Sequence, residues 1–134
     1  ELVAGAFRDP AVGPLVMAGL GGTLTDILED RVLRVPPTSR AQAVAQIHEL
    51  RCAPALHGFR GKPALDVAHA ADVLIALGRL LEAFPEVQEV DLNPLLVTPH
   101  DVWALDARIA VAAPSLEQDA PFRSLRPPLA RRPS

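Results

Sequence analysis

The side chains best suited to chemistry lie in two apolar runs near the end of the chain, joined by a polar turn. This pattern is typical of a β-hairpin. If residues 99–100 form a two-residue loop, the pairing places Asn93 opposite Asp106. The same register sets Asp91 opposite Arg108. Opposed side chains have Cβ atoms roughly 5 Å apart, so two oxygen ligands here can share Mg²⁺, with water and substrate phosphates completing its coordination.

A plainer interpretation of the same pattern stays open, in which Asp91 and Asn93 are solvent-facing residues of an ordinary hairpin. Pro94 bears on the choice because it has no N–H, so its strand lies at an edge or carries a bulge at that point. Bulges re-aim side chains beside active sites. The proline therefore favours a functional role for Asn93.

A second candidate site follows an apolar run, where Gly21 and Gly22 could bring backbone amides close to a phosphate. No GK[ST] follows, so the motif is not a Walker A loop. Taken alone, the motif is better explained as a simple glycine turn between strands. Asp26 lies on the strand expected after these glycines, where it faces either the phosphate or water. Arg60, on a loop and flanked by Gly58 and Gly61, could bind phosphate or carboxylate oxygens, or form a surface ion pair.

The four histidines lack the spacing of a zinc site, and none is assigned a role: His48, His57, His69 and His100. No residue is assigned as a catalytic acid, base or nucleophile.

Composition narrows the class of protein. The chain has 134 residues, of which 49% are hydrophobic and 22% are charged, as in globular domains. A net charge of −3 gives no reason to expect a nucleic-acid or membrane partner. Cys52 is the only cysteine, so no internal disulfide can form, and a cytoplasmic location is expected. The chain opens inside a strand-like run without Met, which suggests a part of something larger.

The elements that position these residues follow from periodicity and turn signals. Strands expected over 2–7, 14–20, 23–28 and 32–35 form an antiparallel meander. A helix capped by Thr38 or Ser39 ends before Pro54, and 53–63 is a loop. Asp66 caps a long helix over about 67–84, which Pro85 ends. The fold class is α+β: a mostly antiparallel sheet with two main helices on one face.

The order of these motifs resembles one family over about residues 1–112. The segments that carry the resemblance are ELVAGAFRDP at 1–10, GPLV at 13–16, GLGGTLTD at 19–26, Arg60-Gly61, DLNPL at 91–95 and LDAR at 105–108. They are similar to the carboxy-terminal half of the ATP-grasp domain in ADP-forming acyl-CoA synthetases, relatives of the succinyl-CoA synthetase β subunit.

The resemblance implies Mg²⁺ and ATP or ADP as cofactors. Asn93 and Asp106 match the Mg²⁺ ligands of the family, and Asp91 stands where relatives carry an acid, which Arg108 could hold in place. Gly21 and Gly22 match the glycine pair of the relatives, and Asp26 stands where relatives have an acid, which implies a place near the phosphate or an incoming phosphohistidine loop.

The same resemblance implies several partners. These are the remaining ATP-grasp lobe, the CoA-binding and phosphohistidine domains, CoA and a small carboxylic acid. The isolated chain would then be an inactive part of the enzyme. An alternative is a ligand-sensing, synthetase-like domain in a protein lysine acetyltransferase of the GNAT type. Residues 1–112 are expected to form the lobe, and 113–134 a proline- and arginine-rich tail.

Overall fold

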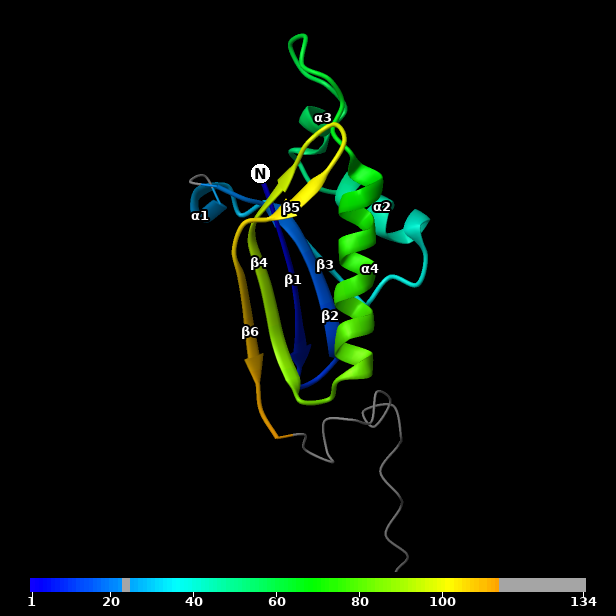
Figure 1. Ribbon diagram of the computed structural model, residues 1–134, viewed down its shortest axis with the longest axis vertical. Helices are drawn as coiled ribbons and strands as arrows, with labels where there is room; N and C mark the ends of the chain where they lie inside the picture. The colour runs from blue at the N-terminus through cyan, green and yellow to red at the C-terminus, as the bar shows by residue number, and fades with distance from the viewer. Residues whose placement is uncertain (23–24, 114–134) are drawn as a thin grey trace, which may run out of the picture.

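A six-stranded antiparallel sheet organises the part of the chain that the structure describes, residues 1–22 and 25–113 of a computed structural model (Figure 1). Its strand order is β3-β2-β1-β4-β5, and β6 also pairs with β4. The strands are β1 (Leu2–Asp9), β2 (Gly13–Leu20), β3 (Arg31–Arg34), β4 (Val87–Val97), β5 (Val102–Ala104) and β6 (Ala107–Val111). The expected tail over 113–134 lies outside the described residues, apart from residue 113.

The expected meander is confirmed for β1, β2 and β3, which pair in sequence order. The strand predicted over 23–28 is wrong, because Thr25–Leu28 forms a short helix, α1. The physical reason is that the Leu20 N–H donates to the Asp30 carbonyl at 2.8 Å. Pairing therefore passes directly from β2 to β3, and the segment between them leaves the sheet. Gly22, at φ 81°, starts this excursion in a conformation that favours glycine.

The predicted hairpin register is confirmed along the whole of the β4 pairing with β5 and with most of β6. Leu96 pairs with Trp103, and Asp91 pairs with Arg108. At the turn the Thr98 N–H donates to the Asp101 carbonyl at 2.8 Å. The bulge expected near Pro94 is also present, since the β1–β4 register shifts between Leu2 and Ala4.

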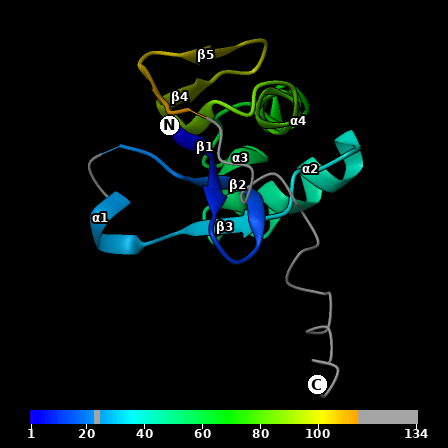
Figure 2. The same ribbon diagram turned by 90° about the horizontal axis from the view of Figure 1, so that it is seen from below.

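Two helices cover one face of the sheet, as expected: α2 (Arg40–His48) and α4 (Val67–Ala83) (Figure 2). Both predicted caps are present: Ser39 accepts from the Gln42 N–H, and Asp66 accepts from the His69 N–H. The buried stripe of α4 packs on alternate residues of β1, β2 and β4. Its members are Ala70, Ala71, Leu74, Leu77, Gly78 and Leu81.

The region predicted as a loop over 53–63 begins with one helical turn, α3 (Ala53–Leu56). Pro54 sits in its first turn, where a missing N–H costs nothing. The chain before it is tied to the sheet by the buried Asp30, whose carboxylate accepts from the N–H groups of Arg51 and Cys52 at 2.7 and 2.8 Å. Among the described helices, none combines the length and apolarity that crossing a bilayer requires.

Cys52 should react slowly with alkylating reagents. Burial, with the neighbouring Asp30 carboxylate, raises the pKa of its thiol to about 11. Since the thiolate is the nucleophile, its fraction at pH 8 falls to about one hundredth of that of an ordinary thiol. Iodoacetamide labelling followed by mass spectrometry should show a rate about 100-fold below that of a free cysteine at pH 8. The rate should still rise up to pH 10, and a plateau by pH 9 would contradict the assignment.

Candidate functional site

The structure places the two strongest site candidates directly opposite each other. The Asn93 N–H donates to the Asp106 carbonyl at 3.2 Å, and both residues are exposed. One step further along, the Leu105 N–H donates to the Pro94 carbonyl at 3.0 Å. Opposed residues of an antiparallel pair direct their side chains to the same face. The backbone bond therefore holds Asn93 and Asp106 beside each other across the hairpin, and both residues are accessible to solvent.

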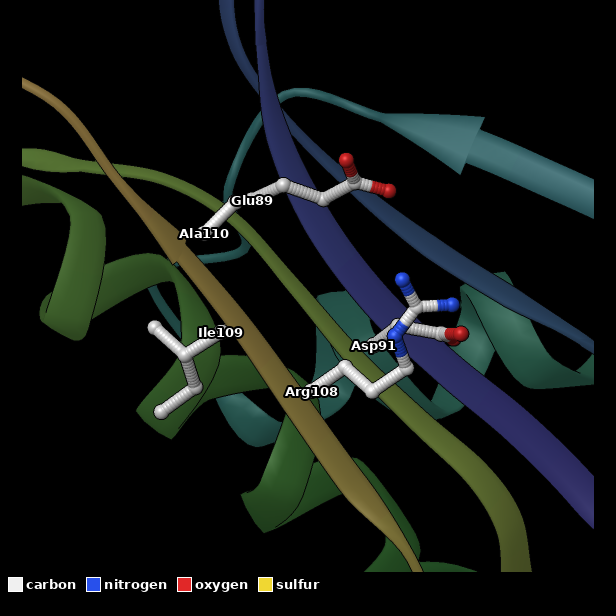
Figure 3. Close-up of a pocket in the computed structure, with 5 residues that line it drawn as sticks. All are labelled: Glu89, Asp91, Arg108, Ile109 and Ala110. Atoms are coloured by element: carbon white, nitrogen blue, oxygen red, sulfur yellow. The ribbon is translucent and has the colours of Figure 1, made fainter.

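Asp91 lies on the face of the sheet opposite to α4, which is named here the open face. Figure 3 shows Asp91, Glu89 and Arg108 extending to this side, whereas Ile109 extends to the other. These residues, with Ala110, line a shallow hollow of ≈ 120 Å³. On the neighbouring strand β1, Gly5 pairs with Asp91. Because glycine has no side chain, the open face beside Asp91 is uncovered at that position.

Glu89 was not among the residues that sequence reasoning selected. A signal for it existed, since side chains two apart on a strand share a face, and Glu89 precedes Asp91 by two. It was hidden because Glu89 pairs with Ala110, which offers no charged partner that would have marked the position. The hollow therefore carries two carboxylates and one guanidinium, where the sequence suggested a single acid–arginine pair.

The residue types fit a hard divalent cation better than a transition metal. The available donors are carboxylate and amide oxygens on exposed or half-buried strand positions. Within residues 1–22 and 25–113 no three or more His, Cys, Asp and Glu side chains gather as a metal cluster. Such a sparse oxygen set suits Mg²⁺, which keeps several waters and substrate phosphates as ligands.

The glycine pair lies at the same end of the sheet. The Gly21 N–H donates to the Glu1 carbonyl at 3.0 Å, and the adjacent Leu2 pairs with both Leu20 and Leu95. Asn93 lies on β4 as well, two residues before Leu95. The chain thus brings the glycine turn and the hairpin candidates to one end of the sheet, with β1 between them.

Gly21 also has a structural reason to be glycine. A Cβ at this position would lie 2.5 Å from the Leu2 carbonyl oxygen, and a backbone atom cannot move aside cheaply. We expect Gly21→Ala to destabilise the fold by about 1–3 kcal/mol, measured by urea denaturation. Gly61→Ala is a useful control because its Cβ meets nothing within 4 Å. Any destabilisation by Gly61→Ala comes from the backbone angle φ of 78° alone. An equal loss of unfolding free energy in both variants would contradict the close-contact explanation.

The remaining candidates are less closely joined to the hairpin. Asp26 belongs to α1, not to a strand as predicted, and its side chain lies outside the described part of the structure. Arg60, at φ 51°, is exposed. Its guanidinium carbon lies 5.2 Å from the centre of the Phe59 ring, which differs from the surface ion pair that was the plainer expectation. A role for either residue at a phosphate stays a prediction.

The histidines occupy separate places in the described structure. The rings of His48 and His57 lie 4.7 Å apart, centre to centre. His69 is paired with the α4 cap residue Asp66, and the His100 N–H donates to the Thr98 hydroxyl at 3.3 Å in the hairpin turn. None of these contacts reaches the candidate site, and the histidines gain no assigned role.

Comparison with known protein families matches residues 1–111 to the ATP-grasp domain. The chain is similar to the β subunit of acetate–CoA ligase [ADP-forming] I from Pyrococcus furiosus, 38% identical over 109 residues, which are 81% of this chain and 47% of that subunit. It is also 42% identical over 113 residues to a trans-feruloyl-CoA synthase from an unknown prokaryotic organism, 83% of this chain and 16% of that protein. The chain therefore spans about half, or less, of the length of these relatives.

The fold agrees with solved structures. The chain superimposes with a TM-score of 0.79 and 39% identity on a dinucleotide forming acetyl-coenzyme A synthetase 1 of Ca. Korarchaeum cryptofilum, covering 84% of this chain and 53% of that one. That structure holds coenzyme A and Mg-AMPPCP, with a phosphohistidine segment pointing towards the nucleotide binding site. The family match shows that the chain belongs to the ATP-grasp family, and the relatives to which it is similar include ADP-forming acetate–CoA ligases.

Proposed function

We propose that this chain supplies the magnesium- and phosphate-binding side of an ATP-grasp site in an ADP-forming acid–CoA ligase. The observation that carries the proposal is the backbone bond that holds the exposed Asn93 and Asp106 beside each other, in a chain of this family. The whole enzyme would join a carboxylic acid to CoA while ATP is converted to ADP and phosphate. The described fold supplies one wall of such a site.

Each residue of the hairpin then has a defined task. The Asn93 amide oxygen and the Asp106 carboxylate hold the cation, and their placement on paired strands fixes the spacing between them. Asp91 stands two pairs further along, where Arg108 faces it and orients its carboxylate. When bound, Mg²⁺ neutralises charge on the nucleotide phosphates and aligns them for transfer.

The residues outside the hairpin complete the phosphate side of the site. Gly21 and Gly22 turn the backbone at the same end of the sheet as Asn93, where the absence of side chains would let a phosphate approach the backbone closely. Arg60 sits on an exposed loop, and its fork of N–H groups suits phosphate oxygens. We assign Asp26 to the same region on the family resemblance.

We infer that the rest of the pocket comes from outside the described chain. The remaining ATP-grasp lobe would cover the nucleotide, and CoA-binding and phosphohistidine segments would deliver the acyl and phosphoryl groups. Support comes from the related structure that contains coenzyme A, Mg-AMPPCP and a phosphohistidine segment. Relatives of the chain are named as ADP-forming acid–CoA ligases, which favours the catalytic role over a sensing role in an acetyltransferase fusion.

The proposal is tested on the whole protein that contains this chain. The protein is incubated with Mg-ATP, CoA and each of a panel of small carboxylic acids, and the products are separated by chromatography. ADP and acyl-CoA should form in equal amounts. Omission of CoA should abolish net ligation. Release of AMP in place of ADP, or no nucleotide turnover with any acid, would argue against an ADP-forming ligase.

The chain alone should bind ATP weakly or not at all. Half of a two-lobed pocket makes few of the contacts that offset the entropy of binding. Isothermal titration with Mg-ATP should therefore give no saturable heat in the micromolar range. Tight binding would mean that the described residues already contain the complete nucleotide pocket.

A further inference from the structure

The outer edge of β6 has the character of an interface. Among the described residues, no strand pairs with this side of β6, which runs along the border of the sheet in Figure 1. Its residues are all exposed, including Ile109 at 57% and Val111 at 66%. Isolated edges are usually protected by lysine, proline or inward-pointing charges. The sequence of β6, ARIAV, has neither lysine nor proline, and its one charge points to the open face (Figure 3).

The backbone of β6 offers hydrogen-bonding groups to a further strand. The Asp106 carbonyl accepts from Asn93 of β4, and the Ala112 N–H donates to the carbonyl of Glu86, the residue directly before β4. Backbone groups alternate between the two sides of an antiparallel strand, so the even-numbered residues face β4. The N–H and carbonyl groups of Ala107, Ile109 and Val111 therefore point outward.

We propose that β6 pairs with β6 of a second copy of this chain, antiparallel and two-fold symmetric about Ile109. A closed dimer requires each copy to present the same surface to the other, and an antiparallel edge does so. In this register Ile109 faces its own counterpart, and Ala107 faces Val111. All of these side chains lie on the α4 side, so the pairing buries one continuous apolar strip.

Charge complementarity fixes this register on the open face. With Ile109 on the two-fold axis, Arg108 of one copy stands beside Ala110 of the other, and Ala110 pairs with Glu89 of its own chain. Arg108 and Glu89 are then two strand spacings apart, about 9.6 Å along the hydrogen-bonding direction. Long side chains bridge that span over the small methyl of Ala110. The symmetry provides this ion pair twice.

Self-association is tested first by analytical ultracentrifugation of the whole 134-residue chain over a concentration series. A dimer with a dissociation constant in the micromolar range is expected, since the interface is small. Ile109→Lys places like charges on the two-fold axis and should raise the dissociation constant by about 10-fold or more. Leu33→Lys, on the opposite edge strand β3, should leave it unchanged. A monomer at all concentrations, or a dimer that survives Ile109→Lys, would overturn the proposal.

The register is tested by single cysteines. Under mild oxidation Ile109→Cys should form an intermolecular disulfide, because facing residues in such a pair have Cα atoms about 5.5 Å apart. Ala107→Cys should not, since its counterpart lies several residues along the partner strand. The native Cys52, half-buried with its pKa raised to about 11, does not compete. Equal cross-linking of both variants would exclude the two-fold at Ile109.

The ion pair is tested by Glu89→Arg, which sets two guanidinium groups across Ala110. We expect it to weaken dimerisation by about 10-fold and to make the remaining association stronger as salt rises. Glu86→Arg is the matched control, since Glu86 is exposed at the start of β4 but lies outside this row. If both substitutions have the same effect, net charge explains the result and the proposed pairing is wrong.

Discussion

Asp106→Ala, introduced into the whole protein, is expected to lower the turnover number for ADP formation by about 10³-fold. The change removes one of two side-chain ligands from the proposed Mg²⁺ site. Loss of a ligand costs several kcal/mol of transition-state stabilisation, and each 1.36 kcal/mol is about tenfold in rate. Asn93→Ala should have a similar effect, because Asn93 is the other proposed ligand and its backbone N–H bonds to the Asp106 carbonyl.

Two variants separate loss of a ligand from loss of structure. Asn93→Asp keeps an oxygen donor at the same distance from the backbone, so it should retain far more activity than Asn93→Ala. Asp101→Ala removes an exposed carboxylate from the neighbouring hairpin turn and should leave turnover within about twofold, as surface changes usually do.

Metal dependence is the readout that a purely structural role would not change. In the Asp106→Ala variant the Mg²⁺ concentration for half-maximal activity should rise, and Mn²⁺ should restore part of the rate because it binds oxygen and nitrogen ligands more tightly. Full activity in both Asn93→Ala and Asp106→Ala would remove these residues from the site.

The hairpin could be predicted from the sequence because its information is local. A polar turn with Pro99 and His100 separates two apolar runs, and once the loop length is fixed the pairs from Val97 back to Glu89 follow. The long helix was similarly predictable, since Asp66 marks its start, Pro85 marks its end and the apolar spacing repeats between them. Both elements carry their boundaries within their own residues.

The elements that were missed depend on distant contacts or weak signals. Residues 23–28 alternate as a strand would, yet the bond from Leu20 to Asp30 leaves that segment outside the sheet. A single helical turn such as α3 has no room for periodicity to appear. Glu89 joined the candidate site only when pairing showed which strand and which face it shares with Arg108.

Arg8 is a residue whose importance only the structure reveals, and its replacement should cause the largest loss of stability. Its guanidinium donates to the carbonyls of Leu81, Phe84 and Val87, at 2.6, 3.1 and 2.9 Å. The first two belong to the C-terminal end of α4, where a positive charge also complements the helix dipole. One side chain from β1 thus holds the end of the long helix and the start of β4 together.

We expect Arg8→Ala to lower the free energy of unfolding by about 3 kcal/mol, because hydrogen bonds from a charged donor contribute about 1.5–3 kcal/mol each and part of this cluster is exposed to water. For a domain of this size the melting temperature should fall by about 10 °C. Thermal unfolding followed by circular dichroism measures it. The melting temperature of Arg8→Lys should lie between those of the wild type and Arg8→Ala, since one ammonium cannot match the planar fork of the guanidinium.

The matched control for Arg8 is Arg34→Ala. Arg34 also binds a partner, Glu49, but both side chains of that pair are about half exposed. Exposed ion pairs contribute at most about 1 kcal/mol, so this variant should melt within a few degrees of the wild type. Arg8 bonds directly to the C-terminal end of α4. Arg8→Ala should therefore raise the hydrogen-exchange rate of the α4 C-terminus more than that of the hairpin. Uniform exchange across both elements would show that Arg8 does not act through the end of α4.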